Sequence, residues 1–408
     1  MNPKMSQKDL RWNLFAESLT EGNASGLEPA KPSIHFADAN MKGQNKLTRR
    51  NFLKLLVAGG IIGGLTAFGI RSKYQLEQSS REFNSTLYPP QKLHVGIKGI
   101  CYSVGTHHPY RLFDCDMKKD IENIHDKLGC NGMRIYGNDE VRLIKCANMA
   151  IEKNFDKILL LPFYEEATGD QLINKVGKIA KEAEKLRREY GNKIEMMIGN
   201  ELSVTSSGIY PGKSYLERSL QILQYMNDET RQKKLTQLLR DLIAVSRAGF
   251  DGRLCYGAGS WEWMLPWDEL DLDILGDQHY WYEGYGNPED PNNEWFNHIK
   301  HYKKFGKPYY NTEFGSGCYK GAFELGGGAW MPERASQPIN EDAQTESIKK
   351  YMEMFNKADT MGLTIEGCFL FRYFGPNVSN DYDIVVSEPV VDHIRRAYNM
   401  YESWQMMY

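Results

Sequence analysis

The sequence predicts an α/β fold in which eight parallel strands close into a (β/α)8 TIM barrel. From Leu93 onward, eight short apolar runs each precede a helical or irregular stretch, which is the βα order of a parallel sheet. The runs lack clean polar alternation, as expected for strands that helices cover. The remaining length of roughly 300 residues suits one barrel of ~250 residues with insertions. A doubly wound open sheet shares many of these signals, so the position of two carboxylates at distant strand ends decides for the barrel.

The predicted strands are bounded by turn residues or by helical periodicity. They are Leu93–Tyr102, Gly132–Tyr136, Lys157–Pro162, Ile194–Glu201, Arg253–Ala258, Leu272–His279, Pro308–Glu313 and Gly367–Phe374. Between the third and fourth runs, apolar residues recur at steps of three and four, which predicts a half-buried outer helix with Leu172, Val176, Ile179, Ala183 and Leu186 on its inner face. The stretch 215–250 is long enough for two helices, and the aromatic stretch 261–268 is a further decoration.

Two glutamates end two of these runs. Glu201 closes the fourth run and Glu313 closes the seventh. Parallel barrels place their catalytic side chains at the carboxyl ends of the strands, and strands four and seven lie on opposite sides of the barrel, so the two carboxyl groups are expected to face each other. Hydrolysis of a glycoside needs one protonated acid and one carboxylate that acts as nucleophile or base. The pair therefore predicts glycosidic bond chemistry.

The pair Asn200-Glu201 at the end of strand four and Glu313 at the end of strand seven resemble the signature of clan A of the glycoside hydrolases. The resemblance covers the barrel. It implies a retaining double displacement with Glu201 as acid/base, Glu313 as nucleophile, Asn200 on the sugar 2-hydroxyl, and no cofactor. The run Met133–Gly137, followed by Asn-Asp, looks most like family 17, the β-1,3-glucanases and related transglycosylases. The eighth run departs from the pattern, since it lacks the tryptophan that many clan members carry there.

Further residues at strand ends are expected to complete the site. Arg134 can hydrogen-bond Glu313 and keep it ionised. His279 and Tyr280 match the place where members of the clan put a residue that orients the nucleophile. Three more candidates line the substrate subsite, namely Tyr136, Arg372 and Tyr373.

Aromatic residues gather after strands five and six, on the predicted active-site face. Flat aromatic rings are the usual platform for sugars, and a single one is more often core filler, but the cluster favours substrate binding. Its members are Trp261, Trp263, Trp267, Tyr280, Trp281, Tyr282 and Tyr285. Acidic residues in neighbouring loops, among them Glu165, Glu166, Glu262 and Glu283, are more often solvated.

The first 92 residues are expected to lie outside the barrel domain, which spans 93–408. Residues 1–46 are polar and predicted to be disordered, and 72–92 form a linker. Within 47–71, Thr48–Lys54 closely resembles the twin-arginine export signal. The apolar run after it is about 16 residues, shorter than the ~20 that span a bilayer, which favours a signal peptide. No Ala-x-Ala site follows, so an uncleaved membrane tether stays open. The expected location is extracytoplasmic, secreted or anchored, with the twin-arginine translocase as partner during export.

Composition excludes several other functions. A net charge of −3 gives no electrostatic case for a nucleic-acid partner. The seven cysteines form no C-x-x-C pair, and the adjacent His107 and His108 are more often loop residues than metal ligands, so neither a metal nor a cofactor is predicted.

The sequence therefore predicts an exported retaining glycosidase that acts on a β-linked oligo- or polysaccharide, with Glu201 having the higher pKa of the pair. Three alternatives stay open: a carbohydrate-binding barrel without turnover, a transglycosylase that shares the covalent intermediate, and an exported protein with a redox cofactor.

Overall fold

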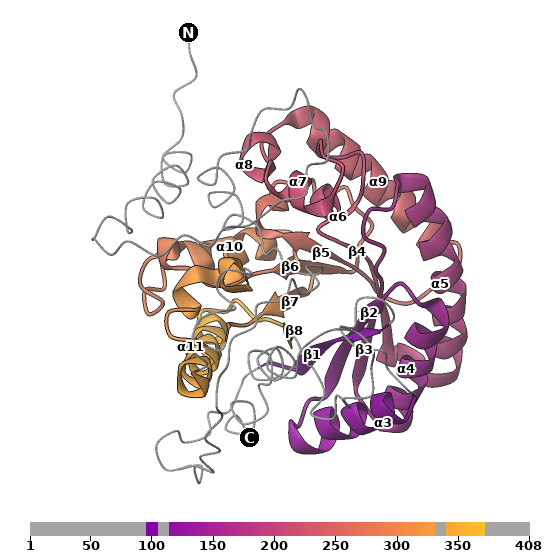
Figure 1. The fold of residues 1–408 in the computed structure, drawn as a ribbon, viewed down its shortest axis with the longest axis horizontal. Helices are drawn as coiled ribbons and strands as arrows, with labels where there is room; N and C mark the ends of the chain where they lie inside the picture. Colours follow the sequence, from indigo (N-terminus) through magenta and orange to yellow (C-terminus); the bar gives the residue numbers. More distant parts are fainter. Residues whose placement is uncertain (1–94, 105–113, 318, 331–339, 372–408) are drawn as a thin grey trace, which may run out of the picture.

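The computed structural model describes residues 95–104, 114–317, 319–330 and 340–371, and within them eight parallel strands form a closed barrel in the order β1 to β8 (Figure 1). The pairing of β1 with β8 closes the ring, from Ile97 opposite Gly367 to Ile100 opposite Leu370, and so rules out the open sheet. The strands are β1 (Ile97–Val104), β2 (Gly132–Gly137), β3 (Lys157–Pro162), β4 (Ile194–Asn200), β5 (Leu254–Gly259), β6 (Ile274–Gln278), β7 (Tyr309–Phe314) and β8 (Gly367–Leu370). The predicted barrel is confirmed.

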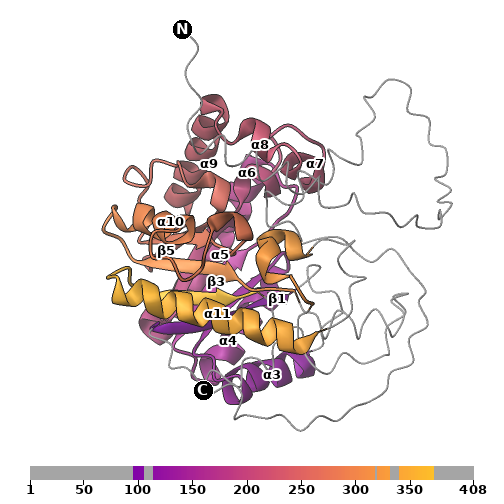
Figure 2. The same cartoon turned by 90° about the vertical axis from the view of Figure 1, so that its left-hand side faces the viewer.

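Helices surround the barrel, as Figures 1 and 2 show. They are α3 (Asp114–Glu122), which continues as a π-helical turn (Asn123–Lys127), α4 (Glu140–Glu152), α5 (Gly169–Tyr190), α6 (Leu202–Thr205), α7 (Tyr215–Ser219), α8 (Ile222–Tyr225), α9 (Glu229–Arg247), α10 (Glu294–Lys303) and α11 (Glu341–Thr360). Short 3-10 segments lie at Gly191–Lys193, Ser260–Glu262, Glu283–Tyr285 and Phe323–Trp330.

The predicted outer helix corresponds to α5. Thr168 caps its first turn through a reciprocal capping box with Gln171, which fixes where the helix begins. All five residues predicted for the inner face of this helix are buried. Its exposed face carries charged side chains such as Lys185 and Glu182, so the helix is amphipathic as expected.

The strand boundaries differ from the predicted ones mainly at β1 and β8. Ladder pairing of the first strand starts at Ile97, whose N–H donates to the carbonyl of Glu366, so the described residues before it lie outside the sheet. The last strand ends at Leu370, well before Phe374. The stretch 215–250 holds three helices, α7 to α9, where two were expected.

The predicted disordered extension, export signal and linker lie outside the described residues. Among the helices that the structure describes, none combines the length and the apolar character that a bilayer crossing requires.

Candidate active site

Glu313, near the end of β7, has both carboxylate oxygens held by other side chains. Arg134 Nη1 donates to its Oε1 at 2.6 Å, and the Tyr280 hydroxyl donates to its Oε2 at 3.0 Å. The residue is 6% exposed. The two donors fix the direction of both oxygens, so the geometry presents Glu313 as an oriented carboxylate.

Arg134 is the hub of the site and is buried inside the barrel. Besides Glu313, its Nη1 donates to the Thr312 carbonyl at 3.1 Å and to Cys101 Sγ at 3.3 Å. Its Nη2 donates to Asn200 Oδ1 at 2.7 Å. One side chain from β2 therefore ties together β1, β4 and β7 at the level of the two glutamates.

Glu201 directly follows β4 and has a very different environment. Its backbone is left-handed, with φ 47° and ψ 46°, which is uncommon for a residue other than glycine and costs on the order of 1 kcal/mol. The residue is 2% exposed, and Oε1 has no hydrogen-bond partner in the described part of the chain. Burial, and next the charge of Glu313, raises the pKa of Glu201 well above its usual value. The geometry thus presents Glu201 as a protonated acid.

The turn after Glu201 is fixed from the side of β5. The Glu262 carboxylate accepts hydrogen bonds from the Ser203 N–H at 3.0 Å, the Tyr256 hydroxyl at 2.7 Å and the Gly259 N–H at 2.9 Å. Tyr256 in turn accepts from the Leu202 N–H at 2.8 Å. Burial raises the pKa of Glu262, and the bonds from Ser203 and Tyr256 oppose this shift. The expectation that Glu262 is a solvated loop acid was wrong, because its oxygens hold the backbone that carries Glu201.

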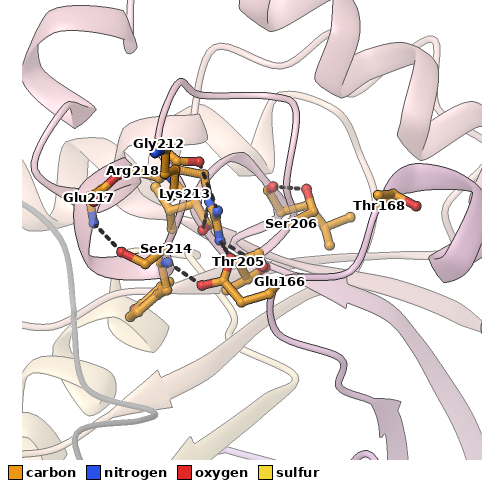
Figure 3. Close-up of polar contacts among 12 residues, drawn as sticks. Glu166, Thr168, Thr205, Ser206, Gly212, Lys213, Ser214, Glu217 and Arg218 are labelled. Atoms are coloured by element: carbon orange, nitrogen blue, oxygen red, sulfur yellow. Dashed lines mark hydrogen bonds and ion pairs between the residues drawn. The ribbon is translucent and has the colours of Figure 1, made fainter.

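A second network fixes the same turn from the side of β3, as Figure 3 shows. Arg218 of α7 is fully buried and donates from Nε to the Val204 carbonyl at 2.6 Å. Its Nη2 donates to Glu166 Oε2 at 2.6 Å and, at 3.4 Å, to the Thr205 carbonyl. The loop after β3 is thereby joined to the segment that follows Glu201. Burial and the charge of Glu166 also raise the pKa of the adjacent Glu165 to about 7.

Asn200 points its carbonyl oxygen at the other polar groups of the site. Its Oδ1 accepts from Arg134 and from Gln278 Nε2. Its amide nitrogen has no hydrogen-bond partner among the described residues, so it remains available as a donor. Gly257 lies beside it on β5, where a Cβ would come within 2.8 Å of Asn200 Oδ1. Sequence reasoning missed Gln278, although its two-residue spacing from Tyr280 was a usable signal.

The sequence offered His279 and Tyr280 as the place of a residue that orients Glu313, and of these two side chains Tyr280 contacts Glu313 and His279 does not. Successive side chains of a strand point to opposite faces, so Gln278 and Tyr280 reach the barrel interior while His279 points outward. Its imidazole stacks on Trp295, with ring centroids 5.1 Å apart. Only its backbone N–H contacts Glu313, by donating to the carbonyl of that residue at 3.1 Å.

The predicted aromatic platform is largely core. Trp281 is buried, its ring stacks on Phe323 with centroids 5.8 Å apart, and its backbone N–H donates to the Tyr351 hydroxyl at 2.7 Å. Trp261 and Trp267 are buried too, so these tryptophans fill space between loops and helices. This corrects the expectation of sugar binding for Trp261, Trp267 and Trp281, and for the other members of the cluster it stays a prediction.

Of the other predicted subsite residues, the structure describes two, Tyr136 and Tyr282. Tyr136 is buried on β2 with its ring 5.5 Å from the Arg134 guanidinium, next to the hub of the site. Tyr282 is half-buried and packs on Tyr285, 4.1 Å away. Arg372 and Tyr373 lie outside the described residues.

No protein-family model matches the sequence, and no curated protein matches it. Solved structures with a similar chain trace include a GH113 β-1,4-mannanase, at 16% identity and TM-score 0.46 over 75% of this chain and 99% of that one. The GH113 β-mannanase of Alicyclobacillus acidocaldarius matches at 14% identity and TM-score 0.46 over 75% of this chain and 98% of that one. A β-glucuronidase of Faecalibacterium prausnitzii matches at 13% identity and TM-score 0.44 over 77% of this chain and 48% of that one.

Proposed function

We propose that the protein is a retaining glycoside hydrolase that cleaves β-linked glycans with Glu201 and Glu313. The observation that carries the proposal is the contrast between two buried glutamates at the ends of β4 and β7. One is held by an arginine and a tyrosine, and the other has a raised pKa and an unpartnered oxygen. Pairs of carboxyl groups in unlike environments mark the acid and the nucleophile of glycosidases.

In the first step, a Glu313 oxygen attacks the anomeric carbon while the glycosidic C–O bond breaks. Glu201 gives its proton to the departing oxygen, so the products are a glycosyl ester on Glu313, an ionised Glu201 and the released alcohol. Arg134 and Tyr280 hold the attacking carboxylate in one orientation. In this proposal the Asn200 amide nitrogen donates to the sugar 2-hydroxyl.

In the second step, the oxygen of a water molecule attacks the same carbon, and the ester bond to Glu313 breaks. Glu201 accepts the proton of the water and returns to its acid form. Because the ester carries no charge, it no longer raises the pKa of Glu201 by repulsion, and the pKa falls at the stage where Glu201 must act as a base.

A sugar hydroxyl in place of water would give transglycosylation through the same intermediate. We place that reaction second among the proposed activities, supported by the resemblance of Met133–Gly137 to family 17.

We also propose that the domain acts outside the cytoplasm, with export by the twin-arginine route supported by Thr48–Lys54. Cell fractionation of the wild type and of a variant with Arg49 and Arg50 both changed to Lys tests the proposal of export.

The deciding experiment measures reducing-sugar release by the full chain from a panel of β-linked glucans, mannans and galactans. Glu313→Gln and Glu201→Gln are tested beside Glu283→Gln, which removes an exposed acid outside the site. We expect release from at least one glycan by the wild type and the control, and none by the two site variants. Equal glycan binding by all proteins without any release would instead support the binding-barrel alternative.

A further inference from the structure

Behind β6, on the side of the strand away from the proposed active site, three polar side chains converge in the interior. Asp277 and His279 come from β6 and the residue after it, and His298 comes from α10. His298 Nε2 lies 2.8 Å from Asp277 Oδ2, and His279 Nδ1 lies 3.6 Å from the same oxygen. One ligand atom from each residue falls within 4.8 Å of the other two.

These groups are not satisfied by hydrogen bonds within the described residues. Asp277 Oδ1, both ring nitrogens of His279 and His298 Nε2 are buried without a hydrogen-bond partner. The short separation of His298 Nε2 and Asp277 Oδ2 is therefore not a well-aligned hydrogen bond. Buried polar groups in native proteins are almost always paired, so four such atoms in one place point to a missing partner.

The charge of this cluster is equally uncompensated. Asp277 and His279 are each 0% exposed, and the His298 side chain is 13% exposed. In the described part of the chain, no lysine or arginine forms an ion pair with Asp277, and its one side-chain hydrogen bond comes from the Tyr309 hydroxyl at 3.3 Å. A buried carboxylate is costly without a cation, so the cluster needs either a protonated imidazole or a metal ion.

We propose that Asp277, His279 and His298 bind one divalent transition-metal ion of the zinc type between β6 and α10. Two imidazole nitrogens and a carboxylate are a donor set that Zn²⁺ accepts, and a bidentate Asp277 would raise the number of protein donor atoms to four.

The site is a structural one, because Trp295 and the other residues packed around His279 leave it in the interior. Its position nevertheless links it to the interior of the barrel. Asp277 and His279 alternate along the chain with Gln278 and Tyr280, which contact Asn200 and Glu313 on the opposite face. A metal ion would fix the carboxyl end of β6 in its place.

The test uses the full chain, stripped with a chelator and titrated with Zn²⁺ alone by calorimetry. His298→Gln removes one ligand, and His301→Gln is the matched control because His301 lies on the same helix and its Nε2 faces the Trp263 carbonyl at 3.1 Å. We expect a one-to-one complex with wild type and control, and an affinity lower by on the order of 100-fold in His298→Gln. Substitution by Co²⁺ should give visible d–d bands of nitrogen and oxygen ligation in the wild type.

Failure of the wild type to bind Zn²⁺ would overturn the proposal and leave a buried aspartate–imidazolium pair as the explanation. Equal affinity in the wild type and His298→Gln would overturn it as well, by placing the metal elsewhere. If His298→Gln does not fold, the Co²⁺ spectrum of the wild type decides, because sulfur ligation or the absence of d–d bands contradicts this donor set. None of these readouts depends on glycosidase activity.

Discussion

The ends of β4 and β7 carry the same amino acid in two opposite settings. At β7, Glu313 lies within the strand, where the register shifts against both β6 and β8, and its two oxygens accept one hydrogen bond each, Oε1 from Arg134 and Oε2 from Tyr280. At β4, Glu201 sits on left-handed backbone, and the networks around it hold its main chain while Oε1 has no partner among the described residues. At the end of β7, side-chain hydrogen bonds hold the carboxylate itself, whereas at the end of β4 they hold the main chain of the turn after Glu201.

This difference shows what separates the two roles that we propose for one residue type. Donors from two side chains fix the direction of the Glu313 carboxylate, whereas burial raises the pKa of Glu201 and favours its protonated form. Strand position alone does not separate the roles. The neighbours contributed by β2, β5 and β6 do.

Removing either carboxyl group should show that the two ends are not equivalent. We expect Glu313→Ala and Glu201→Ala each to lower kcat/KM on a β-glycan by roughly 10⁴-fold. Added azide should then rescue them differently, because it attacks the sugar in place of Glu313 in the first variant and attacks the ester in the second. NMR of the glycosyl azides should show inverted configuration for Glu313→Ala and retained configuration for Glu201→Ala. Identical configurations would contradict the assignment of roles.

Removing the ion pair between Arg134 and Glu313 should have the next largest effect on kcat. Arg134→Gln leaves a buried carboxylate without its cation, which costs about 3–5 kcal/mol, so we expect kcat to fall by on the order of 10²-fold or more and the melting temperature to fall with it. Arg253→Gln is the control, since it removes an arginine paired with Glu195 and Glu366 at the opposite end of the barrel. The control should lower the melting temperature with little change in kcat. Equal losses of kcat in both variants would show that the effect is one of stability alone.

A milder change at the same end is Tyr280→Phe. It removes one hydrogen bond to a charged group, worth about 1.5–3 kcal/mol, so kcat should fall by roughly 10- to 100-fold while the fold persists. Tyr164→Phe removes a tyrosine–glutamate bond outside the site, to Glu140 at 3.0 Å, and should leave kcat unchanged. Circular dichroism of both variants checks that the comparison is between folded proteins, and an unchanged kcat in Tyr280→Phe would count against the role of Tyr280.

The smallest expected effect concerns stability at the β4 end. Because the pKa of Glu201 is raised in the folded state, its protonated form stabilises the fold below the unfolded value of about 4.3, and this contribution is lost as pH rises toward the folded pKa. Glu201→Gln should therefore melt at a higher temperature than the wild type at neutral pH, by a few degrees, with the difference shrinking toward pH 4. The exposed Glu182→Gln on α5 should show no such pH dependence. A constant difference across pH would argue against a raised pKa.

Much of this architecture follows from patterns in the chain. Buried parallel strands are short apolar runs, and both Glu201 and Glu313 stand at their ends, so the barrel and the contact between Arg134 and Glu313 were predictable. The orientation of His279 was not, because a one-residue shift in a strand sends a side chain to the opposite face. Because side chains alternate along a strand, placing Tyr280 inside the barrel would have placed the His279 side chain outside it.

Residues that contact the site from distant parts of the sequence were harder to predict. Glu262 and Arg218 bind backbone groups of the turn after Glu201, and such contacts leave no trace in spacing. The cluster of Asp277, His279 and His298 spans β6 and α10, so no short metal-binding motif marks it. The aromatic residues after β5 were misread because core tryptophans and sugar-binding tryptophans look alike in a sequence.

Because of the position of Arg134, the proposed glycosidase activity should depend on closure of the barrel. The hydrogen bonds of Arg134 reach Cys101 on β1, Asn200 on β4 and Glu313 on β7, so the arrangement exists only when the first, second, fourth and seventh strands share one ring. A fragment that ends before β7 would contain Arg134 but lack Glu313, and a fragment that begins after β2 would contain Glu313 but lack Arg134. During refolding, activity should thus return only when the ring closes, and a circular permutant should be active if its new ends leave both the ring and the turn after Glu201 intact.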